Sequence, residues 1–167
     1  MGLGPLPTLV PKAASRGGFR RVRYATKMPP YADVYALSPS RTTEAVDHFL
    51  DRFAPSREEV TNEYEVPQYE ATPVACFGRA ADVIAFLADH PDEPYSLYWR
   101  NTAADGPAFV MTFFTTDGAI ILGLSCAEEQ AEHWLSELKA FAKANVGSRA
   151  FEQPPPETTV EFLRLCR

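Results

Sequence analysis

The chain has 167 residues, a formal net charge of −6, 46% hydrophobic residues and 12% aromatic residues. This length favours one domain that can fold without disulfides or a metal, and the apolar content excludes a disordered chain. No apolar run approaches the roughly 18 residues of a membrane-spanning helix. The cysteines Cys76, Cys126 and Cys166 form no CxxC pair, which favours a reducing compartment such as the cytoplasm.

The charge is distributed unevenly along the chain. Residues 1–27 contain six basic residues and no acidic one, whereas residues 28–167 contain 10 basic and 22 acidic residues, a formal charge of −12. The acidic body predicts repulsion from nucleic acid and from membrane surfaces, and attraction to a basic protein partner.

Residues 1–27 lack the continuous apolar core of a secretory signal. Their arginines are typical of a mitochondrial targeting segment, but prolines and Gly17-Gly18 break any amphipathic helix. An upstream extension with a misplaced start, a flexible tail and a targeting segment all remain open. In each case we expect residues 1–27 to be disordered or loosely tethered, and residues 28–167 to form one globular acidic domain.

Apolar spacing predicts four elements in the first half of the body: a strand at 31–37, a helix from Thr42 to just before Pro55, a strand at 73–77 and a helix over 78–91. Between them, residues 56–72 are acidic with scattered tyrosines. They predict a long loop with a short strand near 64–69.

The second half begins with three strand-like runs at 95–101, 108–116 and 119–126. Asp117-Gly118 between the last two is a strong hairpin signal. The pattern then predicts a helix over 127–144, an edge strand at 148–153 and a proline-rich linker, while 158–166 fits a helix or a strand. The fold class we expect is α+β: a single layer of about five mostly antiparallel strands, with a central meander at 95–126 and helices packed on one face.

The stretch "GLSCA" at 123–127 lies between a predicted strand and a predicted helix, where a nucleophile elbow would place Ser125. Ala127 replaces the second glycine of that motif, and only His133 follows as a candidate base. We therefore interpret Ser125 as a helix N-cap that forms a capping box with Glu128. Cys126 has a chemical alternative, because a helix N-terminus lowers a thiol pKa, but a buried structural cysteine is favoured.

Metal ligation has little support in the sequence. The histidines His48, His90 and His133 are isolated, and Asp47, His48 and Asp51 share one predicted helix. Two carboxylates there are compatible with a hard cation, yet a solvated face with an ion pair to Arg52 or Arg57 is the simpler interpretation. We expect no catalytic residue, no metal and no cofactor.

The most distinctive surface is an acidic stretch that also contains tyrosines. Carboxylates steer a basic partner and aromatic rings supply contact area. The candidate binding residues are Glu58, Glu59, Glu63, Tyr64, Glu65, Tyr69 and Glu70. The segment "AFEQPPPETT" at 150–159 is a second candidate, because extended proline runs dock on aromatic grooves. A solvated loop and a linker are the corresponding structural interpretations.

Four phrases carry a resemblance to a known family: "NEYEVPQY" at 62–69, "LYWRN" at 97–101, "FFTTDGAIILGLS" at 113–125 and "FEQPPPETTVEF" at 151–162. From Met28 to its end, the chain resembles a small, uncharacterised bacterial α+β family with no assigned activity. The resemblance implies a single bacterial domain and no catalytic residue.

These observations favour a non-enzymatic acidic protein-binding domain. The most concrete version is an immunity-type protein that neutralises a basic toxin. The alternative is a small enzyme or ligand-binding protein with a pocket between sheet and helices, using Cys126 or His133.

Overall fold

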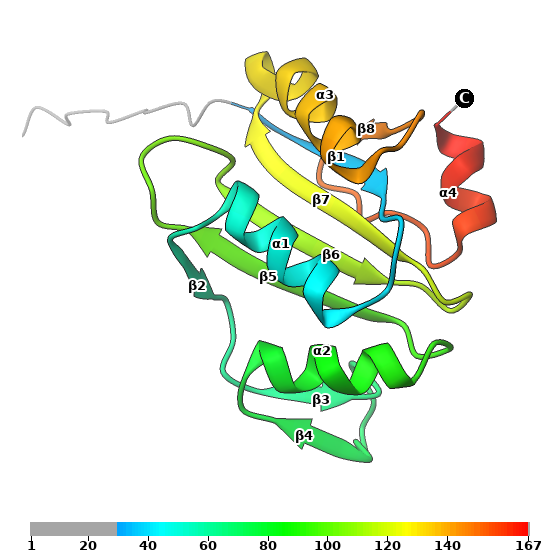
Figure 1. The fold of residues 1–167 in the computed structure, drawn as a ribbon. Helices are drawn as coiled ribbons and strands as arrows, with labels where there is room; N and C mark the ends of the chain where they lie inside the picture. The colour runs from blue at the N-terminus through cyan, green and yellow to red at the C-terminus, as the bar shows by residue number, and fades with distance from the viewer. Residues whose placement is uncertain (1–29, 167) are drawn as a thin grey trace, which may run out of the picture.

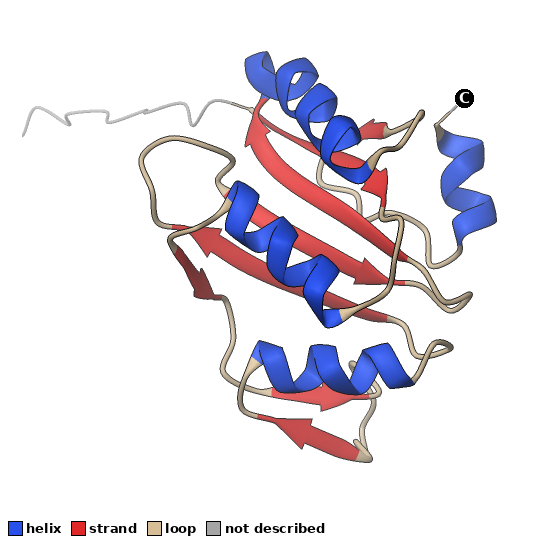
Figure 2. Ribbon diagram, in the orientation of Figure 1, coloured by secondary structure: helices blue, strands red, loops and turns tan. Residues whose placement is uncertain are grey.

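A computed structural model describes residues 30–166. The expectations for residues 1–27 and for a domain start at Met28 lie outside these residues. The strands in this part of the chain are β1 (Tyr31–Leu37), β2 (Arg57–Glu59), β3 (Tyr64–Val66), β4 (Ala75–Phe77), β5 (Tyr95–Asn101), β6 (Phe109–Phe114), β7 (Ile120–Ala127) and β8 (Ser148–Ala150). The helices are α1 (Thr43–Phe53), α2 (Ala80–Asp89), α3 (Ala131–Ala142) and α4 (Thr159–Leu165), and a 3₁₀ turn (Glu128–Gln130) precedes α3 (Figure 2).

Six strands form an antiparallel sheet in the order β2-β5-β6-β7-β1-β8, and β3 and β4 form a separate two-stranded sheet. The predicted meander is confirmed, because β5, β6 and β7 pair as consecutive antiparallel neighbours. Asp117-Gly118 makes the β6–β7 turn, and Gly118 has the positive φ of 86° that such turns require. The predicted fold class is confirmed.

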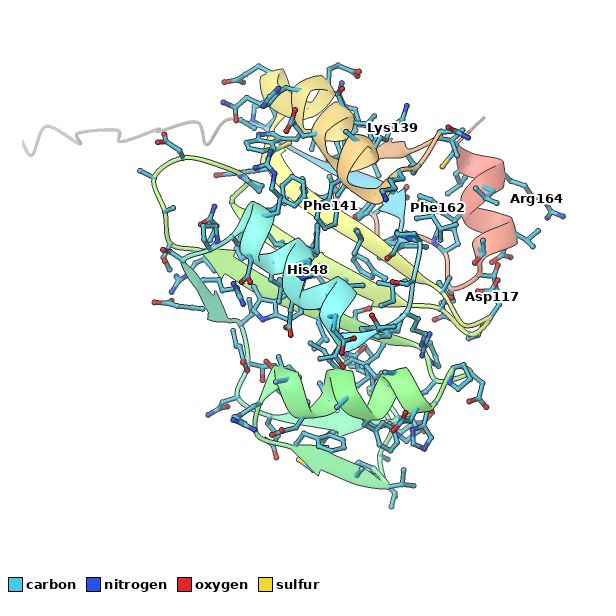
Figure 3. The ribbon with its side chains drawn as sticks, in the orientation of Figure 1. His48, Asp117, Lys139, Phe141, Phe162 and Arg164 are labelled. Carbon is cyan, nitrogen blue, oxygen red and sulfur yellow. The ribbon has the colours of Figure 1, made fainter. Side chains whose placement is uncertain are left out.

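Two helices, α1 and α3, lie across one face of the main sheet, and α2 lies beside α1 over the two-stranded sheet of β3 and β4 (Figure 1). The side chains of Val34, Leu124, Val110 and Trp99 form one row across β1, β7, β6 and β5, and each is at most 2% exposed. Helical spacing gives α1 its buried stripe of Val46, Phe49, Leu50 and Phe53. Phe141 of α3 packs against two of these rings, with centroid distances of 6.0 Å to Phe49 and 5.5 Å to Phe53 (Figure 3).

The last segment, for which the sequence left helix or strand open, is the helix α4. It packs on the opposite face of the sheet, where buried Phe162 contacts a small cluster that includes Tyr35 and Phe113. Asp117 in the β6–β7 turn fixes its start, since the Thr159 amide donates to the Asp117 carboxylate at 2.8 Å. Within residues 30–166, α1 and α3 therefore cover one face of the main sheet, and α4 packs on the other.

Arg41 joins three parts of the fold at the end of the sheet. Its guanidinium donates to five backbone carbonyls: Leu87 O, His90 O, Glu93 O, Thr115 O and Ala119 O, at 2.8–3.1 Å. It also lies over the Phe114 ring, 4.9 Å from the centroid. Burial lowers the Arg41 pKa, and nearby carboxylates, Asp92 foremost, oppose that change. The sequence analysis did not identify this residue.

The capping box predicted for Ser125 is wrong. β7 continues to Ala127 because it stays paired with β1 as far as Tyr31, so Ser125 is a strand residue. The 3₁₀ turn begins only at Glu128, whose amide donates to Pro30 O at 2.9 Å, and neither this turn nor α3 has a side-chain cap. Long-range strand pairing here overrides the local capping pattern.

Gly123 allows close packing between β7 and β1. A Cβ at this position would lie 2.8 Å from the Tyr35 ring. Within residues 30–166, no helix is long and apolar enough to cross a membrane.

Candidate functional site

The acidic stretch 56–72 contains the short strand predicted near 64–69 and, in addition, a strand that the sequence analysis did not predict. It contains β2, which extends the main sheet beside β5, and β3, which pairs with β4. Glu59 anchors it: its Oε2 accepts from the Tyr64 hydroxyl at 2.7 Å and from the Ala80 amide at 3.0 Å. The second bond caps α2 from a distance, because Arg79 at the N-cap position provides no side-chain cap.

Gln68 fixes the end of this stretch against β5. Its side-chain Nε2 donates to Ser96 O at 3.0 Å, and the Ser96 amide donates to its Oε1 at 2.8 Å. The side-chain amide thus takes the place of a neighbouring strand at the half of β5 that β2 does not reach. This pair of hydrogen bonds sets the position of the next residue, Tyr69.

A pocket of about 400 Å³ lies between the loop and the first half of β5. Two carboxylates and four tyrosines dominate its lining: Glu63, Glu65, Tyr64, Tyr69, Tyr95 and Tyr98. A second pocket of about 290 Å³ adjoins it, because both are lined by Gln68, Tyr69, Tyr95, Ser96 and Tyr98. The two pockets form one groove along β5, named the β5 groove below.

The far wall of the β5 groove comes from the proline-rich segment. Pro154, Pro155, Pro156 and Glu157 line the second pocket. The Tyr35 hydroxyl holds this segment over the sheet by donating to Gln153 O at 2.9 Å. The Thr116 amide likewise donates to Glu157 O at 2.9 Å. The structure therefore brings together the two candidate surfaces, which lie far apart in the sequence.

Tyr69 stands between the two pockets and is 87% exposed. Its φ of 68° lies in the left-handed region, which is uncommon for a bulky residue. Strained backbone conformations of this kind cluster at binding and active sites. The conformation presents an aromatic ring to solvent at the centre of the groove.

The charge of the β5 groove is negative. Glu63 and Glu65 line the first pocket and Glu157 lines the second, whereas no Lys, Arg or His is among the described lining residues. Burial, followed by the nearby Tyr69, raises the pKa of Tyr95 to about 12, so this phenol stays protonated at neutral pH. Burial likewise raises the Tyr98 pKa. The groove therefore offers carboxylates and aromatic surface, a combination that suits a cationic side chain.

The structure assigns different surroundings to the seven candidate binding residues. Glu58 forms an exposed ion pair with Arg100, while Glu59 and the buried Tyr64 bond each other inside the fold. Glu63 and Glu65 are exposed and line the groove. Tyr69 is exposed at the centre of the groove, and Glu70 is exposed beside the groove. Four of the seven, Glu63, Glu65, Tyr69 and Glu70, are thus exposed in or beside the β5 groove.

The two residues of the alternative hypothesis, Cys126 and His133, differ in burial and in their contacts. Cys126 is 1% exposed, its thiol faces Ala32 O at 3.6 Å, and burial raises its pKa to about 11. His133 is exposed on α3, where its ring contacts that of Trp134 at a centroid distance of 4.9 Å. A thiol with this pKa is almost entirely protonated at neutral pH and is a poor nucleophile.

The acidic face of α1 does not gather metal ligands. Asp47, His48 and Asp51 are exposed, and Asp51 forms an ion pair with Arg57 at 3.1 Å (Figure 3). Within residues 30–166, no group of three or more His, Cys, Asp or Glu side chains is placed to hold a metal ion.

Sequence reasoning missed part of the β5 groove. Ser96 and Tyr98 alternate with the buried Tyr95, Leu97 and Trp99, so the period-2 pattern of "YSLYWRN" already places them on the other face of the strand. No comparable signal marks Gln68, because its partner is a backbone group 28 residues away.

Comparison with known proteins gives no relative. No protein-family model matches the chain, and neither the curated proteins nor the solved structures yield a match. The resemblance to a small bacterial family stays a prediction.

Proposed function

We propose that this chain is a non-enzymatic, acidic protein-binding domain whose β5 groove binds a basic polypeptide. The observation that carries the proposal is the convergence of the acidic tyrosine stretch and the proline-rich segment on one groove, where the charged lining residues among those that the structure describes are all carboxylates. The negative charge attracts the partner, and Tyr69 and Tyr98 provide contact area once it has arrived.

The most specific form of this proposal is an immunity-type protein that neutralises a basic toxin. Neutralisation needs tight binding and no chemistry, so a rigid groove without a reactive nucleophile is sufficient. Cys76, Cys126 and Cys166 are free thiols, which fits the reducing bacterial cytoplasm that we propose as its location.

The test is a binding measurement against a defined partner, first of all a basic protein encoded by an adjacent gene. The variant Glu63→Lys/Glu65→Lys/Glu70→Lys should lose at least tenfold in affinity, mainly through a slower association rate. High salt should weaken binding by the wild-type domain in the same way.

A charge-matched control separates the groove from net charge. Glu44→Lys/Asp47→Lys/Glu129→Lys changes three exposed carboxylates, two on α1 and one in the 3₁₀ turn before α3. It should retain nearly wild-type affinity for the partner. Equal losses in the two triple variants, or binding that is insensitive to salt, would contradict the proposal.

A further inference from the structure

The chain itself contains a basic segment whose charge is opposite to that of the β5 groove. Residues 12–27 contain all six basic residues of the N-terminal segment, and residues 1–27 contain no acid. We propose that this basic segment occupies the β5 groove in the absence of a partner, so that a partner must displace it. The inference deepens the proposed function and rests on it, because it assumes a groove that accepts basic polypeptides.

The point of attachment fixes which basic residues can reach the groove. Pro30 is held beside β7 by the Glu128 amide, and Tyr31 pairs with Ala127 at the start of β1. Tyr35, Gly123, Met111 and Tyr98 form one row across four strands. Tyr31 is therefore separated from Tyr98 by four residues along the strand direction and by three strand spacings across the sheet. Strand spacing of about 4.8 Å and a rise of about 3.4 Å per residue give a separation of roughly 20 Å.

The reach of an extended chain then divides the basic residues into two groups. The seven residues from Arg23 to Pro30 span at most about 25 Å, which is enough to reach Tyr98. The three residues from Lys27 to Pro30 span only about 11 Å, so Lys27 cannot enter the groove. Arg16, Arg20, Arg21 and Arg23 are the expected contacts, and Lys27 is a built-in control.

The sheet face between the attachment point and the groove is suited to this path. Tyr31 is on the same face of the sheet as Tyr35, as strand alternation requires. Phe109 is on that same face, because it pairs with Ser125 across β6 and β7, and Ser125 pairs with Asp33 on β1. Tyr31, Tyr98 and Phe109 are 36–40% exposed there. The one arginine on the way, Arg100, is paired with Glu58. Exposed aromatic surface thus leads from Pro30 towards the carboxylates.

Because the basic segment is covalently attached to the domain, even weak binding is enough to fill the β5 groove. A tethered segment of this length acts at an effective concentration in the millimolar range. Arginines that bind the carboxylates with millimolar affinity would therefore occupy the groove for much of the time. A competing partner then binds more weakly, in proportion to the fraction of free groove.

The first experiment measures where the segment lies in the full-length chain. In a Ser15→Cys variant that also carries Cys76→Ser and Cys166→Ser, a nitroxide attached at position 15 should broaden the amide signals of residues 63–69 and 95–98. High salt or Glu63→Lys/Glu65→Lys should restore these signals, whereas Glu44→Lys/Glu129→Lys should leave them broadened. Absent broadening, or broadening that salt and the groove reversals do not change, overturns the inference.

The second experiment separates this inference from the proposed function. A synthetic peptide with the sequence of residues 12–27 is titrated into three full-length proteins: wild type, Arg16→Gln/Arg20→Gln/Arg21→Gln/Arg23→Gln, and Lys27→Gln. Both ideas predict binding, and the inference adds that the quadruple variant binds at least about twofold more tightly than the other two, because the segment fills about half of their grooves. Equal affinity in all three overturns the inference and leaves the proposed function standing. No binding to any of them overturns both.

Discussion

Arg41 shows how one side chain can hold several elements together. Five carbonyls from α2, the loop after it and the β6–β7 turn accept its hydrogen bonds. A hydrogen bond to a charged group typically contributes about 1.5–3 kcal/mol, and solvent access at this site reduces the total. The planar guanidinium is essential, since an ammonium group cannot present donors in this fork.

Replacing Arg41 should therefore destabilise the whole fold. We expect Arg41→Ala to lower the free energy of unfolding by about 3 kcal/mol and Arg41→Lys to lower it by somewhat less. Urea denaturation followed by circular dichroism measures both. A loss in Arg41→Ala no larger than that of an ordinary surface substitution, about 0.5 kcal/mol, would show that these five bonds do not stabilise the native state.

Asp33 predicts a pH dependence of stability. Burial raises its pKa, although the Ser125 and Tyr35 hydroxyls act in the opposite direction. A carboxyl whose folded-state pKa is raised stabilises the fold below its unfolded pKa, and this contribution is lost as the pH rises through the folded pKa. The ionised Asp33 is thus unfavourable at neutral pH.

Asp33→Asn should accordingly increase the free energy of unfolding at neutral pH, and the gain should fade as the pH falls and the wild-type carboxyl is protonated. Urea denaturation at a series of pH values tests this. A gain that is the same at acidic and neutral pH would mean that protonation of Asp33 is not its cause.

At the scale of elements, Glu59 links the acidic stretch to α2. The neighbouring Glu58 is a matched control, because it has the same side chain but forms only an exposed ion pair with Arg100. Glu59→Ala removes the acceptor for both the Ala80 amide and the Tyr64 hydroxyl, and should cost about 1–2 kcal/mol. Glu58→Ala should cost less than about 0.5 kcal/mol. Amide hydrogen exchange at Ala80 should accelerate only in the Glu59 variant; similar exchange in both would contradict the remote cap.

The middle of β7 allows a second paired test. Gly123→Ala would place a methyl group 2.8 Å from the Tyr35 ring, and should lower stability by about 1–3 kcal/mol. Ser125→Ala, two residues away on the same face, should change stability by no more than about 1 kcal/mol, because Ser125 caps no helix and loses only the interaction of its hydroxyl with Asp33. A larger loss for Ser125→Ala than for Gly123→Ala, measured by thermal unfolding, would reverse this assignment.

These elements show what sequence reasoning can reach. The spacing of Val46, Phe49, Leu50 and Phe53 is enough to locate α1, and apolar runs around Asp117-Gly118 locate the meander. In both cases the deciding interactions are local or follow directly from periodicity. The capping box at Ser125 failed because pairing with β1, a strand from the other end of the described chain, keeps β7 extended.

The candidate site was predictable only in part. The sequence identifies Glu63, Glu65 and Tyr69 by composition, but it cannot show that Glu59 is used to cap α2 or that Gln68 replaces a strand neighbour of Ser96. Such contacts join a side chain to a distant backbone group and leave no periodic pattern. The meeting of the acidic stretch and the proline-rich segment likewise depends on the path of the chain across the sheet.

At the scale of the whole molecule, the net charge and the shape of the fold both contribute to the proposed binding. The body carries a formal charge of −12, and such a charge by itself attracts any basic molecule to many places on the surface. The β5 groove adds shape, because two adjoining pockets share Tyr69 and Tyr98. Specific binding should therefore appear at the groove and not wherever carboxylates are exposed.

The most direct test of this account is an NMR titration of the full-length chain with a short arginine- and lysine-rich peptide at low ionic strength. The account predicts saturable shifts of the amide signals of residues 60–66, 68–69 and 95–98 and of Gln153 and Glu157, all with one dissociation constant. Shifts of similar size at the exposed carboxylates of α1 and α3, or shifts that do not saturate, would contradict a specific binding groove.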